Sequence, residues 1–185
     1  IPPVSDLSLV LSKFKASRNF KIFSQHADVM NSGAHTGSVA LQSLQALKAS
    51  GVLLNHSEKR FENSILLNEL VKSAASFKLS TMVCAQNVLE AEQLLKKMNV
   101  SYIAVEPPEL IGSGISVSTS RPEIVSHAVK ALRKFKSKII VGAGVSNSDD
   151  VGKAFDLKAD GVLLASAFAK ARDKKDFLRE LASVV

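Results

Sequence analysis

The sequence predicts an α/β protein whose strands are parallel. Short apolar runs of strand type alternate with segments in which apolar residues recur at helical spacing. Parallel strands need helical crossovers, and strands that are apolar along their whole length indicate burial on both faces. The chain has 185 residues, of which 46% are hydrophobic, so we expect a folded core and a single domain over residues 1–185.

Six apolar runs are the expected strands, and each precedes a segment of helical periodicity. The runs are 20–24, 51–54, 79–84, 102–105, 138–141 and 161–164. The helical faces that follow them lie within 39–47, 66–71, 88–95, 124–132, 151–155 and 177–184. One more helix is expected over 7–14, with Asp6 as its N-cap.

Six strand–helix units fit two architectures. An open doubly wound sheet can use six strands, whereas a (β/α)8 barrel needs eight. Periodicity alone leaves both open. In either architecture the functional residues follow the carboxyl ends of the strands, so those positions supply the candidates.

The charge pattern argues against a nucleic-acid partner. The chain carries 24 Lys and Arg against 17 Asp and Glu, and its densest basic run, 130–138, follows an apolar helical face. Cations at that end of a helix complement the macrodipole. Aromatic residues make up only 5%, so nothing resembles a platform for stacking bases.

Membrane, metal and disulfide chemistry are not expected either. No apolar run reaches the roughly 18 residues of a membrane span, so we expect no membrane partner. The single cysteine, Cys84, suits packing and a reducing, cytoplasmic location. His26, His35 and His127 show no metal-ligand spacing, and no metal or other cofactor is expected.

His56 is the first candidate, because it follows the run 51–54. Ser57 and Glu58 open a possible helical turn whose positive end would keep the imidazole neutral. A neutral ring can donate a hydrogen bond to a substrate carbonyl. A surface histidine near a helix cap is an equally good interpretation of the position alone.

Glu106 is the second candidate, at the end of the run 102–105. Burial makes a carboxylate a stronger base, which suits proton transfer. The residues from Pro107 to Gly114 place rigid proline at one end and glycine at the other, as in a loop that closes as a lid. In an ordinary turn Glu109 would be equivalent, but the strand placement favours Glu106.

Small residues follow the last two expected strands. Gly142-Ala143-Gly144 comes after one and Ala165-Ser166 after the other, and such loops let backbone N–H groups approach a phosphate. The first loop leads into a helix for which Ser148 and Asp149 are cap candidates.

Together these segments resemble the triosephosphate isomerase family, specifically its archaeal type. The matching segments, in the order and spacing of the family, are SQHAD, GAHTGS, GVLLNHSEKR, YIAVEPPELIGSG, VGAGVS and DGVLLASAFAKA. The resemblance implies a TIM (β/α)8 barrel. It also implies interconversion of dihydroxyacetone phosphate and D-glyceraldehyde 3-phosphate through an enediolate, in glycolysis and gluconeogenesis, without a cofactor.

The resemblance also assigns roles to the candidates. This family is itself the standard illustration of a neutral histidine working with a glutamate base, so His56 would polarise the carbonyl and Glu106 would move the proton. A closed lid would exclude water from the enediolate. The positions that match the family's phosphate site are Ile111, Gly144, Ala165 and Ser166.

One part of the family pattern is not found. The family's first strand ends in Asn-x-Lys, whose ammonium lies in the active site. Asn19-Phe20-Lys21 imitates it but runs directly into 22–26, which match the third strand, so Lys21 is expected at the wrong end. We expect strands 3–8 to be complete, strand 1 and most of strand 2 to be absent, and little isomerase activity from these residues alone.

The resemblance implies a homo-oligomer, a dimer or the homotetramer common in archaeal members, in which the loop 33–38 inserts into a neighbouring subunit. Two alternatives remain open. Another phosphate-binding barrel enzyme, such as ribulose-phosphate epimerase or thiamine-phosphate synthase, would share the last two loops but has no use for Glu106 under a lid. A non-catalytic remnant would bind sugar phosphate weakly or only assemble.

Overall fold

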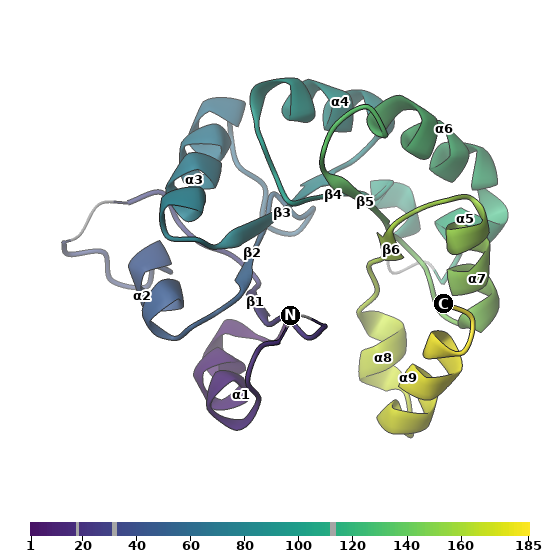
Figure 1. The fold of residues 1–185 in the computed structure, drawn as a ribbon, viewed down its shortest axis with the longest axis horizontal. Coiled ribbons are helices and arrows are strands. Elements are labelled where there is room, and N and C mark those ends of the chain that lie inside the picture. Colours follow the sequence, from purple (N-terminus) through teal and green to yellow (C-terminus); the bar gives the residue numbers. More distant parts are fainter. Residues whose placement is uncertain (18, 31–32, 112–113) are drawn as a thin grey trace. The chain divides into compact units, whose positions relative to one another are not determined.

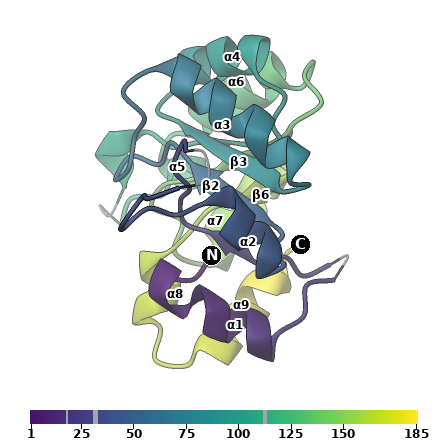
Figure 2. The same ribbon diagram turned by 90° about the vertical axis from the view of Figure 1, so that its left-hand side faces the viewer.

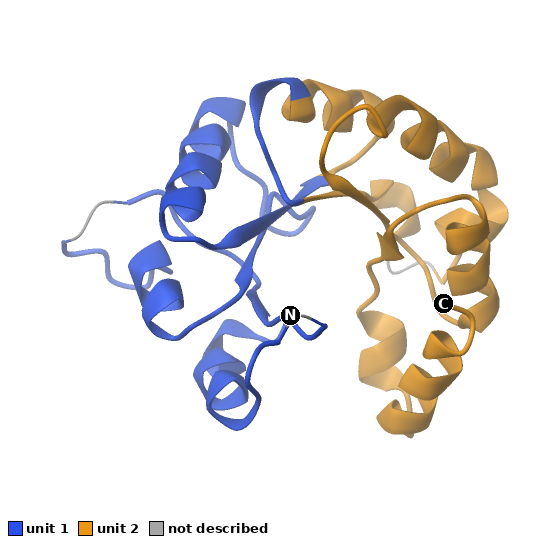
Figure 3. Cartoon of the chain, in the orientation of Figure 1, with its two compact units in different colours: residues 1–84, 96–101 blue, residues 85–95, 102–185 orange. Residues whose placement is uncertain are grey.

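The computed structural model describes residues 1–17, 19–30, 33–111 and 114–185. These residues form two compact units, which we describe separately (Figure 3). Unit 1 contains residues 1–84 and 96–101, and unit 2 contains residues 85–95 and 102–185. The expectation of a single domain over residues 1–185 stays a prediction.

Unit 1 is built on three short parallel strands (Figure 1). They are β1 (Phe23–Ser24), β2 (Gly51–Leu54) and β3 (Ser80–Ala85), and the register places Ser24 opposite Val52 and Leu54 opposite Val83. The helical elements are η1 (Val4–Asp6), α1 (Leu7–Lys13), α2 (Leu41–Ala46) and α3 (Ser64–Ser76). In two views α2 and α3 lie on the same side of these strands (Figures 1 and 2).

Local chemistry explains where α3 begins and which face it buries. The Asn63 side chain accepts hydrogen bonds from the backbone N–H groups of Ile65 and Leu66, both at 3.0 Å. The side chains of Leu67, Leu70, Val71 and Ala74 are buried, which is the spacing of a single helical face.

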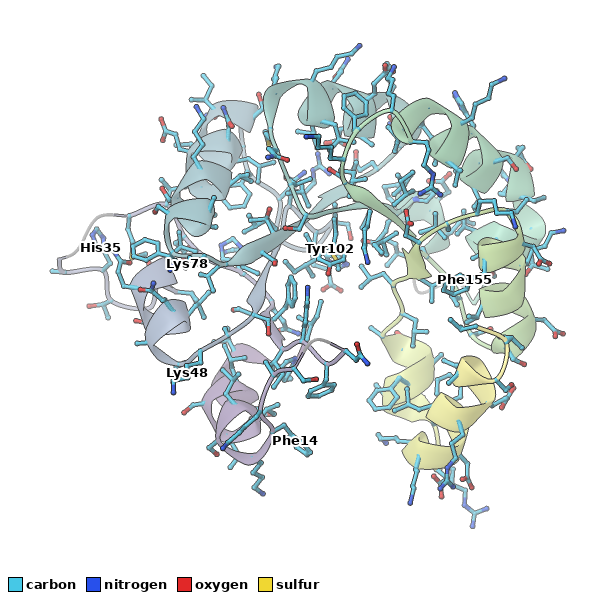
Figure 4. The ribbon with its side chains drawn as sticks, viewed as in Figure 1. Phe14, His35, Lys48, Lys78, Tyr102 and Phe155 are labelled. Atoms are coloured by element: carbon cyan, nitrogen blue, oxygen red, sulfur yellow. The ribbon has the colours of Figure 1, made fainter. Side chains whose placement is uncertain are left out.

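The two lysines after α2 and α3 end these helices in the same way. Lys48 and Lys78 adopt φ of 62° and 58°, the left-handed conformation common just beyond a helix carboxyl end. Figure 4 shows both residues beside the helices that they end. The N–H of Lys78 donates to the carbonyl of Ala75 at 3.0 Å, which satisfies one of the last acceptors of α3.

Unit 2 is also built on three parallel strands. They are β4 (Tyr102–Val105), β5 (Lys138–Val141) and β6 (Gly161–Val162), with Val105 opposite Val141 and Val141 opposite Val162. The helical elements are α4 (Val88–Lys97, mostly in unit 2), η2 (Pro108–Leu110), α5 (Val117–Ser120), α6 (Pro122–Leu132), α7 (Ser148–Asp156), α8 (Ser166–Lys170) and α9 (Lys174–Ala182).

The core of unit 2 joins β5 to the helices around it. Val141 and Ala143 pack in one buried cluster with Val117 of α5, Val125 of α6 and Ala154 of α7. A cluster of this kind holds α5 and α7 against the carboxyl end of β5, where the candidate phosphate loop begins.

The α/β class and the parallel strands are confirmed, with shorter strands at both ends of the series. Three strands have the expected bounds, but β1 covers only 23–24 of 20–24 and β6 only 161–162 of 161–164. The short helices α5 and α8 were not expected, because four or five residues are too few to show a helical period. Within the described residues, no helix is long and apolar enough to cross a membrane.

Of the cap predictions, one is confirmed and one is wrong. Asp6 does occupy the N-cap of α1, although its side chain makes no capping hydrogen bond. The N-cap of α7 is Asn147 and not Ser148 or Asp149, because the Asn147 side chain accepts from the N–H of Asp150 at 2.9 Å.

Replacing two glycines with alanine should have opposite effects on stability. A Cβ on Gly51 would lie 2.2 Å from the carbonyl oxygen of Ser80, so Gly51→Ala should lower the free energy of unfolding by roughly 1–3 kcal/mol. Gly152 lies inside α7, where the nearest atom to a new Cβ is 3.7 Å away, so Gly152→Ala should raise it by up to about 1 kcal/mol. Urea unfolding measures both, and equal stability of the two variants would contradict the packing described for β1–β3.

Candidate active site

In each unit the candidates follow the carboxyl ends of the parallel strands. His56 comes after β2 in unit 1. In unit 2, Glu106 comes after β4, Gly144 after β5, and Ala165 and Ser166 after β6. Because neighbouring parallel strands end at the same edge of a sheet, each unit gathers its candidates at one edge.

The position before His56 is held in place by Asn55. This residue is 3% exposed and adopts φ of 60°, which asparagine tolerates better than most side chains. Its Nδ2 donates to the carbonyl oxygen of Cys84 at 2.9 Å, and its Oδ1 accepts from the N–H of Phe61 at 3.2 Å. Asn55 therefore ties the loop 55–61, which carries His56, to the end of β3.

One backbone hydrogen bond reaches the His56 ring. The N–H of Glu58 donates to Nδ1 from 3.3 Å, an arrangement in which Nε2 is the ring nitrogen that can donate to a substrate. The Glu58 carboxylate lies 3.7 Å from Nδ1, but its side chain is 83% exposed and interacts weakly through water.

The expected helical turn after His56 is a single turn and not a helix. Its one backbone hydrogen bond runs from the N–H of Lys59 to the carbonyl of His56 at 2.9 Å. The expected effect of a helix macrodipole on this ring is therefore not supported, because a macrodipole needs several aligned peptide groups.

Glu106 is buried, with 6% of its surface exposed, whereas Glu109 in η2 is exposed. The register that pairs Val105 with Val141 places Gly142 beside Glu106, and a Cβ on Gly142 would lie 2.5 Å from Oε1. The Glu106 N–H donates to the carbonyl of Ala85 at 2.9 Å. The carboxylate thus lies against bare backbone, in the dehydrated surroundings that proton transfer requires.

The segment after the expected lid packs directly on the loop after β5. Gly144 has φ of 71°, and a Cβ there would lie 1.9 Å from the carbonyl oxygen of Ile115. The N–H of Val117 donates to the carbonyl of Ala143 at 3.1 Å. Ile111 packs against the same buried cluster as Val117, while Gly112 and Ser113 of the expected lid lie outside the described residues.

The residues that connect β6 to α8 are exposed where the helix begins. Ala165 occupies the N-cap position of this helix, and its carbonyl accepts from the N–H of Ala169 at 2.9 Å. Ala165 and Ser166 are both exposed. Their small side chains leave the backbone N–H groups at the start of α8 accessible to an anion.

Within the described residues, no three His, Cys, Asp or Glu side chains lie close enough together to hold a metal ion. Cys84 is buried at the end of β3, as the packing interpretation predicts. Its carbonyl group, which accepts from Asn55, is what it contributes to the candidate site.

The sequence interpretation missed two structural residues of the site. Asn55 could have been suspected, since asparagine between a strand and a turn often adopts positive φ. Gly142 was considered only as part of a phosphate loop, and nothing in the sequence shows that its missing side chain makes room for the Glu106 carboxylate. That function depends on the register between β4 and β5.

The combination at the strand ends is a buried carboxylate, a histidine and loops of small residues. On parallel strands, this combination is typical of α/β enzymes that act on small phosphorylated substrates. A family model described as triosephosphate isomerase matches residues 1–183. The chain belongs to the triosephosphate isomerase family, as its resemblance implies.

Individual relatives agree over most of the chain. The triosephosphate isomerase of Methanocaldococcus jannaschii is 37% identical over 185 residues, which are 97% of this chain and 80% of the relative. That of Methanosarcina acetivorans is 40% identical over 186 residues, covering 100% of this chain and 81% of the relative. That of Methanothermus fervidus is 41% identical over 165 residues, covering 88% and 73%.

Removing the Asn55 side chain should loosen the loop that carries His56. Asn55→Ala loses both hydrogen bonds and leaves a Cβ at positive φ, so we expect the free energy of unfolding to fall by about 1–3 kcal/mol. Asn55→Gly loses the same bonds without the strain and should retain roughly 1 kcal/mol more. Urea unfolding and hydrogen exchange at the Phe61 amide check this; an unchanged exchange rate in both variants would contradict the assignment.

Proposed function

We propose that the candidate groups of this chain serve the reaction for which its relatives are named, the interconversion of dihydroxyacetone phosphate and D-glyceraldehyde 3-phosphate, although little activity is expected from residues 1–185 alone. The observation that carries the proposal is the family match over residues 1–183. The buried carboxylate after β4 and the histidine after β2 are the proposed reactive groups.

Glu106 is the proposed base. It removes a proton from the carbon next to the carbonyl of dihydroxyacetone phosphate and returns it to the neighbouring carbon. A carboxylate that lies against the backbone of Gly142 is poorly solvated and therefore a stronger base than one in water. The same backbone contact limits the positions that the carboxylate can take.

His56 is the proposed electrophile. Its Nε2–H donates a hydrogen bond to the substrate oxygen on which negative charge develops as the enediolate forms. The N–H of Glu58 donates to Nδ1, which leaves Nε2 for the substrate. The two hydrogen bonds of Asn55 hold the loop from which the ring projects.

Backbone groups are proposed to bind the phosphate. Gly144 supplies a left-handed turn after β5, and Ala165 and Ser166 supply the start of α8. Ile111 and the residues around it would close over the phosphate and exclude water, which protects the enediolate. The net charge of +7 adds a general attraction for an anionic substrate.

We also propose that β1 to β6 correspond to the third to eighth strands of a (β/α)8 barrel. The only Asn-x-Lys of the sequence ends at Lys21, which precedes β1 and so lies at its amino end. Functional groups of this fold follow the carboxyl ends of the strands, so Lys21 is not proposed as an active-site residue.

The two alternative functions are not favoured. An epimerase or synthase of the phosphate-binding barrels would not account for a family match to triosephosphate isomerase over residues 1–183. Relatives that match 97% and 100% of the chain are named for the isomerase, which does not favour a remnant that only binds or assembles.

Glu106→Gln should abolish proton transfer while leaving binding nearly unchanged. The amide has almost the same shape but cannot act as a base, so we expect kcat to fall about 10²–10⁴-fold. The measurement is deuterium uptake from D₂O into dihydroxyacetone phosphate, together with a coupled isomerase assay. Glu123→Gln, which removes an exposed carboxylate from α6, is the matched control. Deuterium uptake at the unsubstituted rate in Glu106→Gln would rule Glu106 out as the base.

A homodimer or homotetramer is the proposed assembly, with the loop 33–38 as the contact. All residues of this loop are exposed, and its ends are joined by hydrogen bonds between Asp28 and Val39 in both directions, at 2.9 and 2.7 Å.

His35→Asp should weaken the assembly, because it places a charge where a neighbouring subunit would bury it. We expect sedimentation equilibrium to give a multiple of 19.8 kDa for the unsubstituted chain and a shift toward 19.8 kDa for this variant. His127→Asp makes the same exchange at an exposed position of α6 and should not change the mass. A monomeric unsubstituted chain would disprove the assembly.

A further inference from the structure

Asp150 is a buried carboxylate that the proposed reaction does not use. It lies in the first turn of α7 and is 4% exposed, whereas its neighbour Asp149 is exposed. Acidic residues are common in the first turn of a helix, where they interact with the macrodipole, but that interaction needs no burial. Burying a carboxylate is costly unless its oxygens are satisfied by hydrogen bonds.

Donors from two different segments satisfy the two oxygens of Asp150. The Ser146 N–H and hydroxyl donate to Oδ2 at 2.9 and 3.2 Å. The Thr119 hydroxyl donates to Oδ1. Ser146 belongs to the loop after β5, and Thr119 belongs to α5, which follows the expected lid.

The backbone of Asp150 strengthens the same connection. Its carbonyl accepts from the Ser118 hydroxyl at 2.7 Å, and its N–H donates to the Asn147 side chain at 2.9 Å. The Ser118 hydroxyl lies 2.9 Å from that of Ser116. All of these residues belong to unit 2, and together they join α5, the loop 142–147 and α7.

The protonation state of Asp150 agrees with this arrangement. Burial acts to raise the pKa of the Asp150 carboxyl group, but the hydrogen bonds from Thr119, Ser146 and Ser116 outweigh it and hold the pKa below its usual value. The group is therefore ionised at neutral pH. An ionised carboxylate can accept from all of these donors on its two oxygens. An amide in the same place would offer one oxygen and would have to donate from its nitrogen.

We propose that Asp150 is a positioning residue that sets the spacing between the phosphate-binding loop 142–146 and the segment 115–119 at the carboxyl end of the lid. This inference rests on the proposed function, which places the substrate phosphate at Gly144. The spacing matters because a Cβ on Gly144 would already overlap the carbonyl of Ile115, so the two segments are in direct backbone contact. A small shift of either segment changes the set of N–H groups that can meet a phosphate.

Asp150→Asn tests the proposal with almost no change of shape. The amide oxygen can keep the two donors of Ser146, but the amide nitrogen then faces the Thr119 hydroxyl, which must become the acceptor, so the charge-assisted hydrogen bond to α5 is lost. We expect the Kd for inorganic phosphate, measured by calorimetry, and the KM for dihydroxyacetone phosphate to rise about tenfold, with kcat changed less than about threefold. Asp149→Asn removes the same charge from an exposed site of the same helix turn and should leave both constants unchanged.

Thr119→Val is the second, milder variant, which decides the question if Asp150→Asn does not fold. It removes the donor to Oδ1 and keeps both donors from Ser146, so the Kd for phosphate should rise about threefold. In Asp150→Asn, Thr119→Val should have no further effect, because the two residues act through one bond.

Two results would overturn the proposal, and they have different meanings. If Asp150→Asn or Thr119→Val lowers the urea midpoint but leaves the phosphate Kd and the KM unchanged, Asp150 only stabilises the start of α7. If the unsubstituted chain itself does not bind inorganic phosphate, the proposed phosphate site is wrong, and the role of Asp150 is overturned with it.

Discussion

The register of β4 against β5 is the constraint on which the proposed chemistry depends. Pairing Val105 with Val141 makes the next residues, Glu106 and Gly142, neighbours at the carboxyl ends of the two strands. The carboxylate can then lie against backbone that has no side chain. A shift of one residue in this register would turn the Glu106 side chain to the opposite face of the sheet, because side chains alternate along a strand.

The loop after β5, which continues from the paired strand, carries the proposed phosphate site. The backbone of Gly144 packs against that of Ile115, and the carbonyl of Ala143 accepts from Val117, so the end of the lid and the phosphate loop form one structure. The small residues of the loop thus serve two purposes. They leave N–H groups open to an anion, and they let two backbones meet without intervening side chains.

In unit 1, side-chain hydrogen bonds hold the backbone from which His56 projects. Asn55 adopts positive φ at the end of β2 and binds backbone groups of Cys84 and Phe61, so the histidine follows a fixed position. The ring then receives one N–H from Glu58. Both units therefore place the reactive group directly after a buried strand and use the next few residues to orient it, which limits the freedom that binding must remove.

Local patterns are enough to predict the α/β class, most strand positions and the candidates His56, Glu106 and Gly144, because apolar periodicity and residues at strand ends are local signals. The same patterns do not reveal that β1 and β6 are so short, that Asn147 caps α7, or where the side chains of Asn55 and Asp150 bind. Each of these depends on a partner distant in the chain or on a hydrogen bond that several nearby side chains could have made. They are visible only in the folded chain, since contacts such as Asp150 with Thr119 join residues that no local pattern connects.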